Sequence, residues 1–347
     1  MSVLREQLGQ LLLVGFRGIR LEECGPILRD LRQHRIGGII LFDQEMVDPS
    51  TRRRNVESPE QLRTLVAGLR AAAGHPLIVA VDQEGGRVNR LKPDYGFPPS
   101  VSHEELGRRD DPAHTYREAE QTARTLAAAG INLNLAPVVD LDANAANPII
   151  KGKGRSFSAD PATVTRHATA FIQAHRAHGI RTCLKHFPGH GSAAGDTHHG
   201  LVDVTATWSE RELEPFRDLI RGGLADAVMS AHVFHAGLDR RHPATLSAAV
   251  LSGLLRQKLG FGGVICSDDM EMGAISSRYG LEESVPAAVE AGVDLLCFGN
   301  NQRYDPEIAP KAIAILEQAV ISGRLSEERI AASVARIRTL QGAPATG

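Results

Sequence analysis

Short, continuously apolar segments alternate with helical patterns along most of this 347-residue chain, and no other feature constrains its fold as strongly. The segments are rich in β-branched residues, as is typical of parallel strands covered by helices on both faces. They are 36–42 (IGGIILF), 76–82 (PLIVAVD), 131–141 (INLNLAPVVDL), 182–187 (TCLKHF), 227–233 (AVMSAHV), 263–269 (GVICSDD) and 295–299 (LLCFG). The alternation predicts an α/β protein, a single (β/α)8 barrel of the TIM type spanning residues 1–347, with a doubly wound sheet as the alternative.

The sequence between these segments contains residues that indicate where helices begin and end. Ser58, Pro59 and Gln61 combine an N-cap, a proline in the first turn and a capping box, and Gly74 is a suitable C-terminal stop. The range 209–222 carries a second pattern of this kind, with a serine followed three residues later by a glutamate. Both ranges are therefore predicted to be helices.

The N-terminus predicts an amphipathic helix rather than a secretion signal, because its leucines recur at helical spacing: Leu4, Leu8, Leu11 and Leu12. No segment approaches the roughly 20 apolar residues of a membrane span. Four cysteines lie far apart without a Cys-x-x-Cys pair, which favours buried thiols. We therefore expect a soluble, reduced, cytoplasmic protein with no membrane partner.

The charge balance gives no sign of a nucleic-acid partner. Lys plus Arg number 39 and Asp plus Glu 41, so the formal net charge is 39 − 41 = −2. The single concentrated basic run, 51–55 (TRRRN), is interpreted as a solvated loop. Nucleic acid is therefore not expected as a partner.

Ionisable residues stand at the ends of several predicted strands. A single aspartate in such a place is more often the N-cap of the next helix. Several together are costly to desolvate unless pairing or function requires them, and the carboxyl ends of barrel strands meet at one mouth. The residues are Asp82, Asp140, Lys185, His186, His232, Asp268 and Asp269.

The segment 185–200 (KHFPGHGSAAGDTHHG) permits a metal site, a proton-transfer loop or a polar connection. Pro188 and Gly189 disfavour the helix that would direct His186 and His190 at one ion, and the first predicted strand ends in LFDQE rather than in a His-x-His pair. The glycine-rich segments DQEGGRV and KGKGRSF lack a nucleotide-binding pattern. We expect no metal and no cofactor.

KHFPGHG followed by DTH, together with VDQEGGRV, GRSF and SDDMEMGAI, resembles the glycoside hydrolases of family three. Within that family the chain is most similar to single-domain bacterial β-N-acetylglucosaminidases of the peptidoglycan-recycling type. The resemblance extends from the first strand to about Gly299 and implies a catalytic barrel.

The resemblance also implies roles for individual residues. Asp268, the first aspartate of SDD, is the implied nucleophile, and His198 with Asp196 forms the implied acid/base dyad. The implied sugar-binding residues are Asp82, Arg90, Arg155, Lys185 and His186. The family usually has an acidic residue directly after the second glycine of GHG, whereas Ser192 follows here. His199 is therefore retained as an alternative acid/base.

Retaining glycoside cleavage needs a rigid carboxylate and a proton donor, and a histidine oriented by a carboxylate can donate near neutral pH. The implied activity is that of a retaining exo-β-N-acetylglucosaminidase (a β-N-acetylhexosaminidase) acting on a GlcNAc-containing muropeptide or oligosaccharide. The alternatives are a β-N-acetylglucosaminide phosphorylase and a β-glucosidase of the same family. A small carbohydrate is the expected partner, and the chain is expected to be a monomer or weak dimer.

Overall fold

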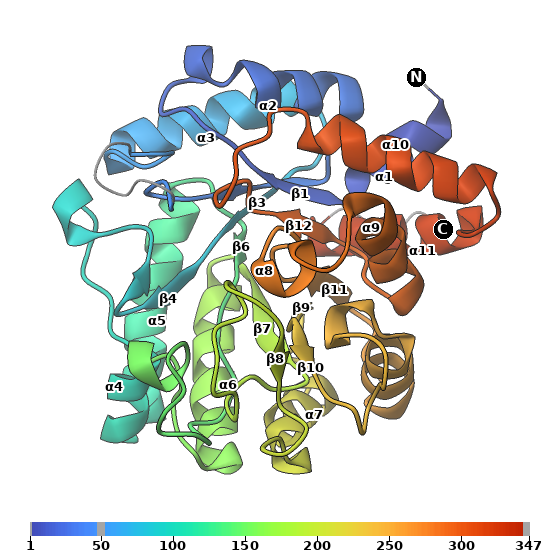
Figure 1. Ribbon diagram of the computed structural model, residues 1–347. Helices are drawn as coiled ribbons and strands as arrows, with labels where there is room; N and C mark the ends of the chain where they lie inside the picture. Colours follow the sequence, from blue (N-terminus) through green and yellow to red (C-terminus); the bar gives the residue numbers. More distant parts are fainter. Residues whose placement is uncertain (1, 47–52, 343–347) are drawn as a thin grey trace.

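Eight parallel strands form the centre of the molecule in the computed structural model, which describes residues 2–46 and 53–342 (Figure 1). Their spatial order is β11-β9-β7-β6-β3-β2-β1-β12. They are β1 (Leu12–Gly15), β2 (Gly38–Leu41), β3 (Ile78–Val81), β6 (Leu133–Asn134), β7 (Arg181–Phe187), β9 (Ala227–Ser230), β11 (Val264–Ser267) and β12 (Leu296–Phe298). A parallel bridge between Cys266 and Leu295 joins the two outer strands and closes the sheet. The barrel prediction is confirmed, and the doubly wound alternative, which needs an open sheet, is wrong.

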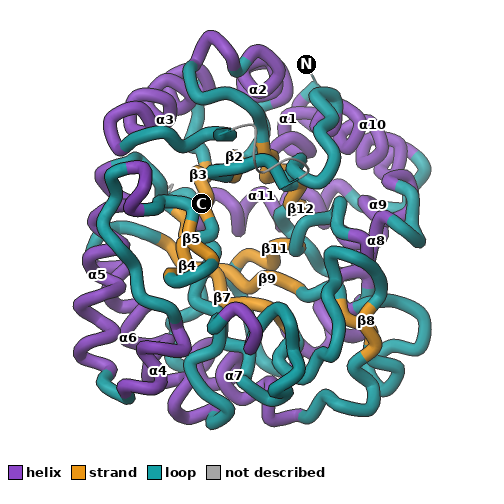
Figure 2. Tube along the Cα trace, turned by 60° about the vertical axis from the view of Figure 1, so that its left-hand side comes forward, coloured by secondary structure: helices purple, strands orange, loops and turns teal. Residues whose placement is uncertain are grey.

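Helices surround the strands on the outside, as the view in Figure 2 shows. They are α1 (Val3–Gln10), α2 (Gly25–Arg29), α3 (Pro59–Ala73), α4 (His103–Arg109), α5 (Pro112–Ala128), α6 (Pro161–Ala177), α7 (Glu214–Arg221), α8 (Gly273–Ser276), α9 (Leu281–Ala291), α10 (Ile308–Ile321) and α11 (Glu327–Leu340). Helical segments of 3₁₀ or π geometry are η1 (Leu21–Glu23), η2 (Asp30–His34), η3 (Pro93–Tyr95), η4 (Lys151–Lys153), η5 (Glu210–Leu213), η6 (Ala244–Leu246) and η7 (Ala249–Lys258). Two small ribbons lie in the loops: β4 (Gln83–Gly85) with β5 (Val88–Asn89), and β8 (Val202–Asp203) with β10 (Val233–Phe234).

The predicted helix boundaries are confirmed best for α3. The Ser58 hydroxyl accepts a hydrogen bond from the Gln61 amide at 3.2 Å, and Gly74 ends the helix in a left-handed conformation with φ of 64°. The second signal is only partly right. Ser209 makes no side-chain cap bond, and its segment begins with the turn η5 before α7 starts at Glu214.

Two strand predictions need correction. The N-terminal helix was predicted from Leu4, Leu8, Leu11 and Leu12, but it ends at Gln10. Leu12 belongs instead to β1, whose four residues are all buried between β2 and β12. The segment ending in LFDQE is therefore the second strand. In 131–141 only Leu133 and Asn134 form a ladder, because Pro137 has no amide hydrogen to donate, and Val138 contributes only an isolated bridge to Lys185.

The basic run 51–55 is not simply a solvated loop. Thr51 and Arg52 lie outside the described residues, but Arg54 is 1% exposed. Its Nε donates to the Phe16 carbonyl at 2.8 Å, and its guanidinium lies 3.7 Å from Glu45. Arg54 thus secures the loop after β2 to the start of the barrel, and the earlier interpretation is wrong for this residue.

All four cysteines, Cys24, Cys183, Cys266 and Cys297, are free and buried, as predicted. Burial raises the pKa of the Cys24 thiol to about 12, so this thiol is a packing group rather than a nucleophile. No helix within residues 2–46 and 53–342 is both long and apolar enough to cross a bilayer.

Asp294 is the polar centre of the barrel's amino-terminal end. It is fully buried just before β12, and it accepts hydrogen bonds from the Ile265 amide at 3.0 Å and from the Ser333 hydroxyl at 2.7 Å. Three arginines also pair with it: Arg256, Arg329 and Arg336. One carboxylate therefore connects β11, β12, η7 and α11 where the barrel closes.

We predict that Asp294→Asn lowers the free energy of unfolding by about 3 kcal/mol or more, because it leaves three guanidinium groups around an uncharged amide. Urea unfolding followed by circular dichroism measures the change. Glu290→Gln is the matched control, because Glu290 pairs with Arg324 at 2.9 Å where both side chains are 38% exposed. It should cost less than about 1 kcal/mol. Equal losses in both variants would contradict the role given to Asp294.

Candidate active site

A cavity of about 580 Å³ opens at the carboxyl ends of the barrel strands. Its lining includes seven of the eight residues predicted from the sequence: Asp82, Arg90, Arg155, Lys185, His186, His198 and Asp268. The eighth, Asp196, is hydrogen-bonded to His198, which lines the cavity. The fold therefore brings together residues that are up to about 190 positions apart in the chain.

Asp268 directly follows β11 and is partly exposed to the cavity. Its backbone amide donates to the Ser230 carbonyl at 3.2 Å, and its Oδ1 accepts from the Asp269 amide at 2.8 Å. Burial raises the pKa of this carboxyl, but His232, His186 and His198 outweigh it and bring the pKa to about 2. Asp268 is thus an ionised, rigidly held carboxylate at neutral pH.

The neighbouring Asp269 is placed differently. Its Oδ1 accepts from the amides of Gly299 at 3.0 Å and Glu271 at 3.1 Å, so it connects the loops after β11 and β12. Burial raises its pKa, and burial followed by the charge of Asp269 also raises that of Glu271. His232, another predicted strand-end residue, is fully buried with both ring nitrogens hydrogen-bonded, to Thr245 and to the Asp269 carbonyl. Of these three side chains only Asp269 lines the cavity with Asp268.

His198 and Asp196 form a hydrogen-bonded pair. The Nδ1 of His198 donates to Asp196 Oδ1 at 2.7 Å, and the His198 amide donates to the same oxygen at 2.9 Å. Burial raises the pKa of Asp196, but the bonds from His198 lower it overall. Since Nδ1 is committed to the carboxylate, Nε2 is the nitrogen available for proton transfer. His199 has an 85% exposed side chain and is absent from the cavity lining.

The loop that carries this pair is docked against the turn after Asp268. The amides of Gly273 and Ala274 donate to the carbonyls of His198 and Thr197, at 3.2 and 3.0 Å. A Cβ at Gly273 would lie 2.7 Å from the His198 carbonyl oxygen, closer than side chains tolerate. The SDDMEMGAI motif therefore provides both the strand-end aspartate and a docking surface that only glycine permits at this position.

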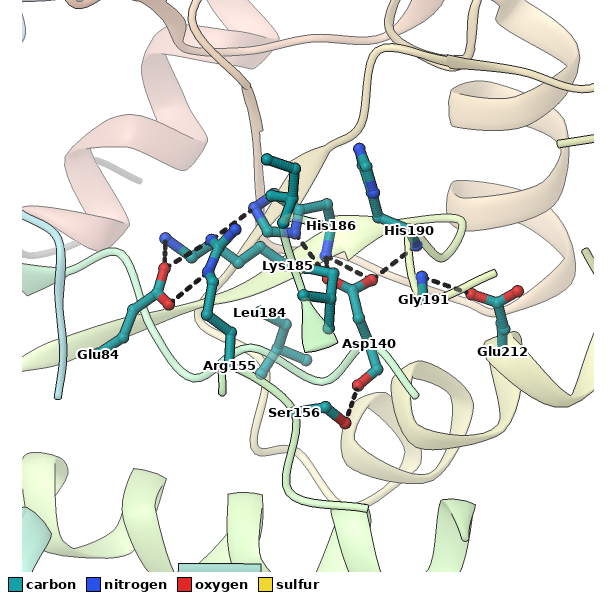
Figure 3. A network of polar contacts seen from close by, with 12 residues as sticks. Glu84, Asp140, Arg155, Ser156, Leu184, Lys185, His186, His190, Gly191 and Glu212 are labelled. Carbon is teal, nitrogen blue, oxygen red and sulfur yellow. Dashed lines mark hydrogen bonds and ion pairs between the residues drawn. The ribbon is translucent and has the colours of Figure 1, made fainter. Parts of the chain in front are cut away.

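Glu84 is the central site residue that the sequence reasoning missed. It is buried, and it binds Arg155 through two hydrogen bonds of 2.7 Å and Lys185 at 2.6 Å (Figure 3). Burial raises its pKa, but the two cations bring it well below the usual range. A signal was present in DQEGGRV, because Glu84 lies two residues after Asp82 and side chains two apart in an extended segment share a face.

Asp140 positions the histidines of KHFPGHG. It is fully buried, and it accepts from His186 Nδ1 at 2.6 Å and from the His190 amide at 2.8 Å (Figure 3). His186 Nε2 lies 3.2 Å from Arg155 Nη2, so both ring nitrogens of His186 have a polar neighbour. Lys185, the preceding residue, donates to Asp82 at 2.7 Å, and Arg90 lies 3.7 Å from the same carboxylate. Cations and carboxylates thus alternate along this wall.

Glu212 is the glutamate of the second capping pattern, in the range 209–222. In the structure it instead supports the loop after β7 that contains Gly191. It is 1% exposed, and its Oε2 accepts from the Gly191 amide at 2.9 Å (Figure 3). Burial raises its pKa to about 7. In the described part of the chain, no three His, Cys, Asp or Glu side chains are grouped so that they could hold a metal ion.

Comparison with known proteins identifies the family to which the chain is similar. The model of the glycosyl hydrolase family 3 N terminal domain matches residues 3–340. A β-hexosaminidase from Tolumonas auensis is 39% identical over 277 residues, 78% of this chain and 78% of that protein. A β-hexosaminidase from Neisseria meningitidis serogroup B is 37% identical over 297 residues, 80% of this chain and 78% of that protein.

Solved structures agree with this result. A family 3 β-N-acetylglucosaminidase from Paenibacillus sp. superposes with a TM-score of 0.89 at 36% identity, covering 100% of this chain and 64% of that longer one. A β-N-acetylhexosaminidase from Beutenbergia cavernae superposes with a TM-score of 0.87 at 30% identity, and 99% of each chain is covered. Because the family model and these relatives match over most of its length, this chain belongs to glycosyl hydrolase family 3 and is a glycoside hydrolase.

Proposed function

We propose that this protein is a retaining exo-β-N-acetylglucosaminidase that releases terminal β-linked N-acetylglucosamine from muropeptides during cytoplasmic peptidoglycan recycling. One observation carries the proposal: an ionised carboxylate, Asp268, and a carboxylate-oriented histidine, His198, face the same cavity. This is the pair of groups that retaining cleavage requires. Relatives named β-hexosaminidase at 37–39% identity support the choice of sugar.

In the first step, the Asp268 carboxylate attacks the anomeric carbon while the His198 imidazolium gives its Nε2 proton to the departing oxygen. The bond from the anomeric carbon to the leaving oxygen breaks, and a glycosyl ester forms on Asp268. The low pKa of Asp268, about 2, keeps the nucleophile ionised at neutral pH. Asp196 stabilises the imidazolium before the proton is transferred.

In the second step, His198 is a neutral base and takes a proton from water. The water oxygen attacks the anomeric carbon from the face that the aglycone has left, and Asp268 departs as a carboxylate. Two inversions give net retention of the β configuration. The same histidine serves as acid and then as base, so it must remain beside the anomeric centre through both steps.

The clamp of Asp82, Arg90, Arg155, Lys185 and His186 binds the hydroxyl groups of the released sugar in this proposal. Arg155 and Lys185 are fixed by Glu84, and His186 by Asp140, before any sugar binds. A site with polar groups held in advance rejects sugars that lack a matching hydroxyl, because its buried charges would then be left unpaired.

A panel of 4-nitrophenyl β-glycosides tests the activity. We expect kcat/KM for the N-acetylglucosaminide to be at least about tenfold higher than for the glucoside. The glucoside has no acetamido group, so polar groups of the pocket would lose water without gaining hydrogen bonds to that group. Added phosphate should not accelerate sugar release or yield a sugar phosphate. A preference for glucose would favour the β-glucosidase alternative, and phosphate-dependent release would favour the phosphorylase.

The nucleophile is tested by Asp268→Asn, which should lower kcat/KM by roughly three orders of magnitude or more, because an amide cannot form the ester intermediate. The thermal midpoint serves as the folding control. A mechanism-based fluorosugar should label Asp268 of the wild-type enzyme, as read by peptide mass spectrometry. Label on Asp269 would show that the nucleophile is misassigned.

The acid/base is tested by leaving-group dependence. His198→Ala should lower kcat/KM by roughly 10²–10⁴ on a natural disaccharide but much less on a 2,4-dinitrophenyl glycoside, whose phenolate departs without a proton. Azide should partly restore turnover with the activated substrate and give a β-glycosyl azide. His199→Ala is the matched control, because its side chain is 85% exposed, and it should change neither rate. Leaving-group dependence in the His199 variant would instead transfer the role to His199.

A further inference from the structure

A small hydrophobic cluster lies beside the loop 188–201, which connects β7 to β8 and carries His198. Its buried members are Ala193, Val202, Val204, Ala231 and Val233. Pairing of Val202 with Val233 joins β8 to β10 within this cluster (Figure 1). Ala193 precedes Asp196 by three residues, and Val202 follows His198 by four. The cluster therefore holds the chain on both sides of the acid/base dyad.

Trp208 connects this cluster to the rest of the molecule. It is the single tryptophan of the chain, and it packs half-buried against both the small cluster and the main core. Its indole Nε1–H donates to the carbonyl of Pro188 at 3.0 Å, where the loop begins. Its ring also meets the ring of His235 edge to face, with the centroids 4.9 Å apart. One side chain thus contacts the start of the loop and the cluster that borders the dyad.

The start of the loop is held from one segment by a donor and an acceptor. Trp208 donates to the carbonyl of Pro188, and Glu212, four positions further along, accepts from the amide of Gly191 at 2.9 Å. Between these two bonds the loop passes so close to Glu212 that a Cβ at Gly189 would lie 2.6 Å from the Glu212 Cβ. Residues 188–191 are therefore fixed against the segment between β8 and α7.

His198 depends on this indirect support. Within residues 2–46 and 53–342, the ring of His198 has one hydrogen-bond partner, Asp196, and the carboxylate of Asp196 in turn bonds only to residues of the same loop. Neither side chain of the dyad is tied to another element by a hydrogen bond of its own. The place of His198 relative to Asp268 is therefore set by the contacts that hold the loop, and glycine-containing loops have much conformational freedom to lose.

We propose that Trp208 is a positioning residue for proton transfer: by anchoring the loop 188–201, it keeps His198 within reach of the departing oxygen. The inference rests on the proposed function, in which His198 is the acid/base. Trp208 does not line the cavity, so it acts on the substrate only through the loop. A displacement of about 1 Å can slow a reaction between positioned groups by roughly 100-fold. Loss of the anchor should therefore weaken acid catalysis selectively.

Trp208→Ala removes both the indole hydrogen bond and the packing. Its kcat/KM should fall roughly tenfold more on a natural disaccharide than on 2,4-dinitrophenyl β-N-acetylglucosaminide, whose phenolate departs without a proton. Trp208→Phe keeps a ring in the cluster but cannot donate to Pro188, so we expect a smaller selective loss of about threefold. The measured quantity is the ratio of kcat/KM for the two substrates, which does not depend on the fraction of each variant that is folded.

Tyr116→Ala is the matched control. Tyr116 is also a half-buried aromatic residue packed against a small hydrophobic cluster, but it lies on α5 and its cluster is Ala119, Ala136, Phe171 and Ala174. Its removal should lower the thermal midpoint and leave the ratio of the two kcat/KM values unchanged. An unchanged ratio in both Trp208 variants, or a selective loss of equal size in Tyr116→Ala, would overturn the role given to Trp208.

His198→Ala in the same assay separates this inference from the proposed function. If His198→Ala shows the leaving-group dependence and the Trp208 variants do not, only the positioning role is wrong. If His198→Ala shows no such dependence, the acid/base assignment in the proposed function fails, and the role of Trp208 fails with it. A selective loss in all three variants, largest in His198→Ala and smallest in Trp208→Phe, is the result that we expect.

Discussion

The buried carboxylate of Glu84 is the interaction on which the active-site wall depends. It binds Arg155 by two hydrogen bonds and Lys185 by one ion pair, where water is largely excluded. Removing it would leave two neighbouring cations buried beside each other, and uncompensated buried charge is among the costliest defects in a protein. Through Arg155 and Lys185 the same carboxylate fixes the positions of His186 and Asp82. Each of these side chains is therefore stabilised by neighbours of opposite charge or by hydrogen bonds, in place of the water that is excluded.

Asp268 and His198, the two groups proposed to be catalytic, have different kinds of support. Asp268 lies at the end of a barrel strand and is positioned by ladder and turn hydrogen bonds. His198 belongs to a glycine-containing loop, which is secured at one end by Glu212 and at the other by the amides of Gly273 and Ala274. A rigidly held carboxylate and a histidine on a docked loop suit the proposed mechanism, in which one group attacks the sugar and the other must let the aglycone leave. Gly273 follows Asp268 by only five residues, so a single turn helps to position both Asp268 and His198.

Adjacent carboxylates in this cavity have opposite properties because their environments differ. Asp268 is surrounded by histidines that lower its pKa, whereas Asp269 faces Glu271 in a buried setting that raises the pKa of both. Sequence adjacency therefore says little about ionisation. The same logic applies to two lysines of the turn η4: Lys151, which does not line the cavity, has two carboxylate partners, whereas Lys153, which does, has none among the described residues.

The sequence by itself determined the barrel class, seven of its eight strands, the capped helix α3 and the residues Asp268, His198 and Asp196 as candidates, because these depend on periodicity, local hydrogen bonds and short motifs. It placed Leu12 in a helix rather than in the strand β1, since leucine spacing cannot show that a segment will be paired with strands on both sides. Only the tertiary structure decided that Glu84 unites Arg155 with Lys185, that Glu212 supports a loop rather than capping a helix, and that Arg54 is buried. These roles arise from contacts between residues far apart in the chain, and burial changes the energy of a charge by an amount that no local pattern encodes.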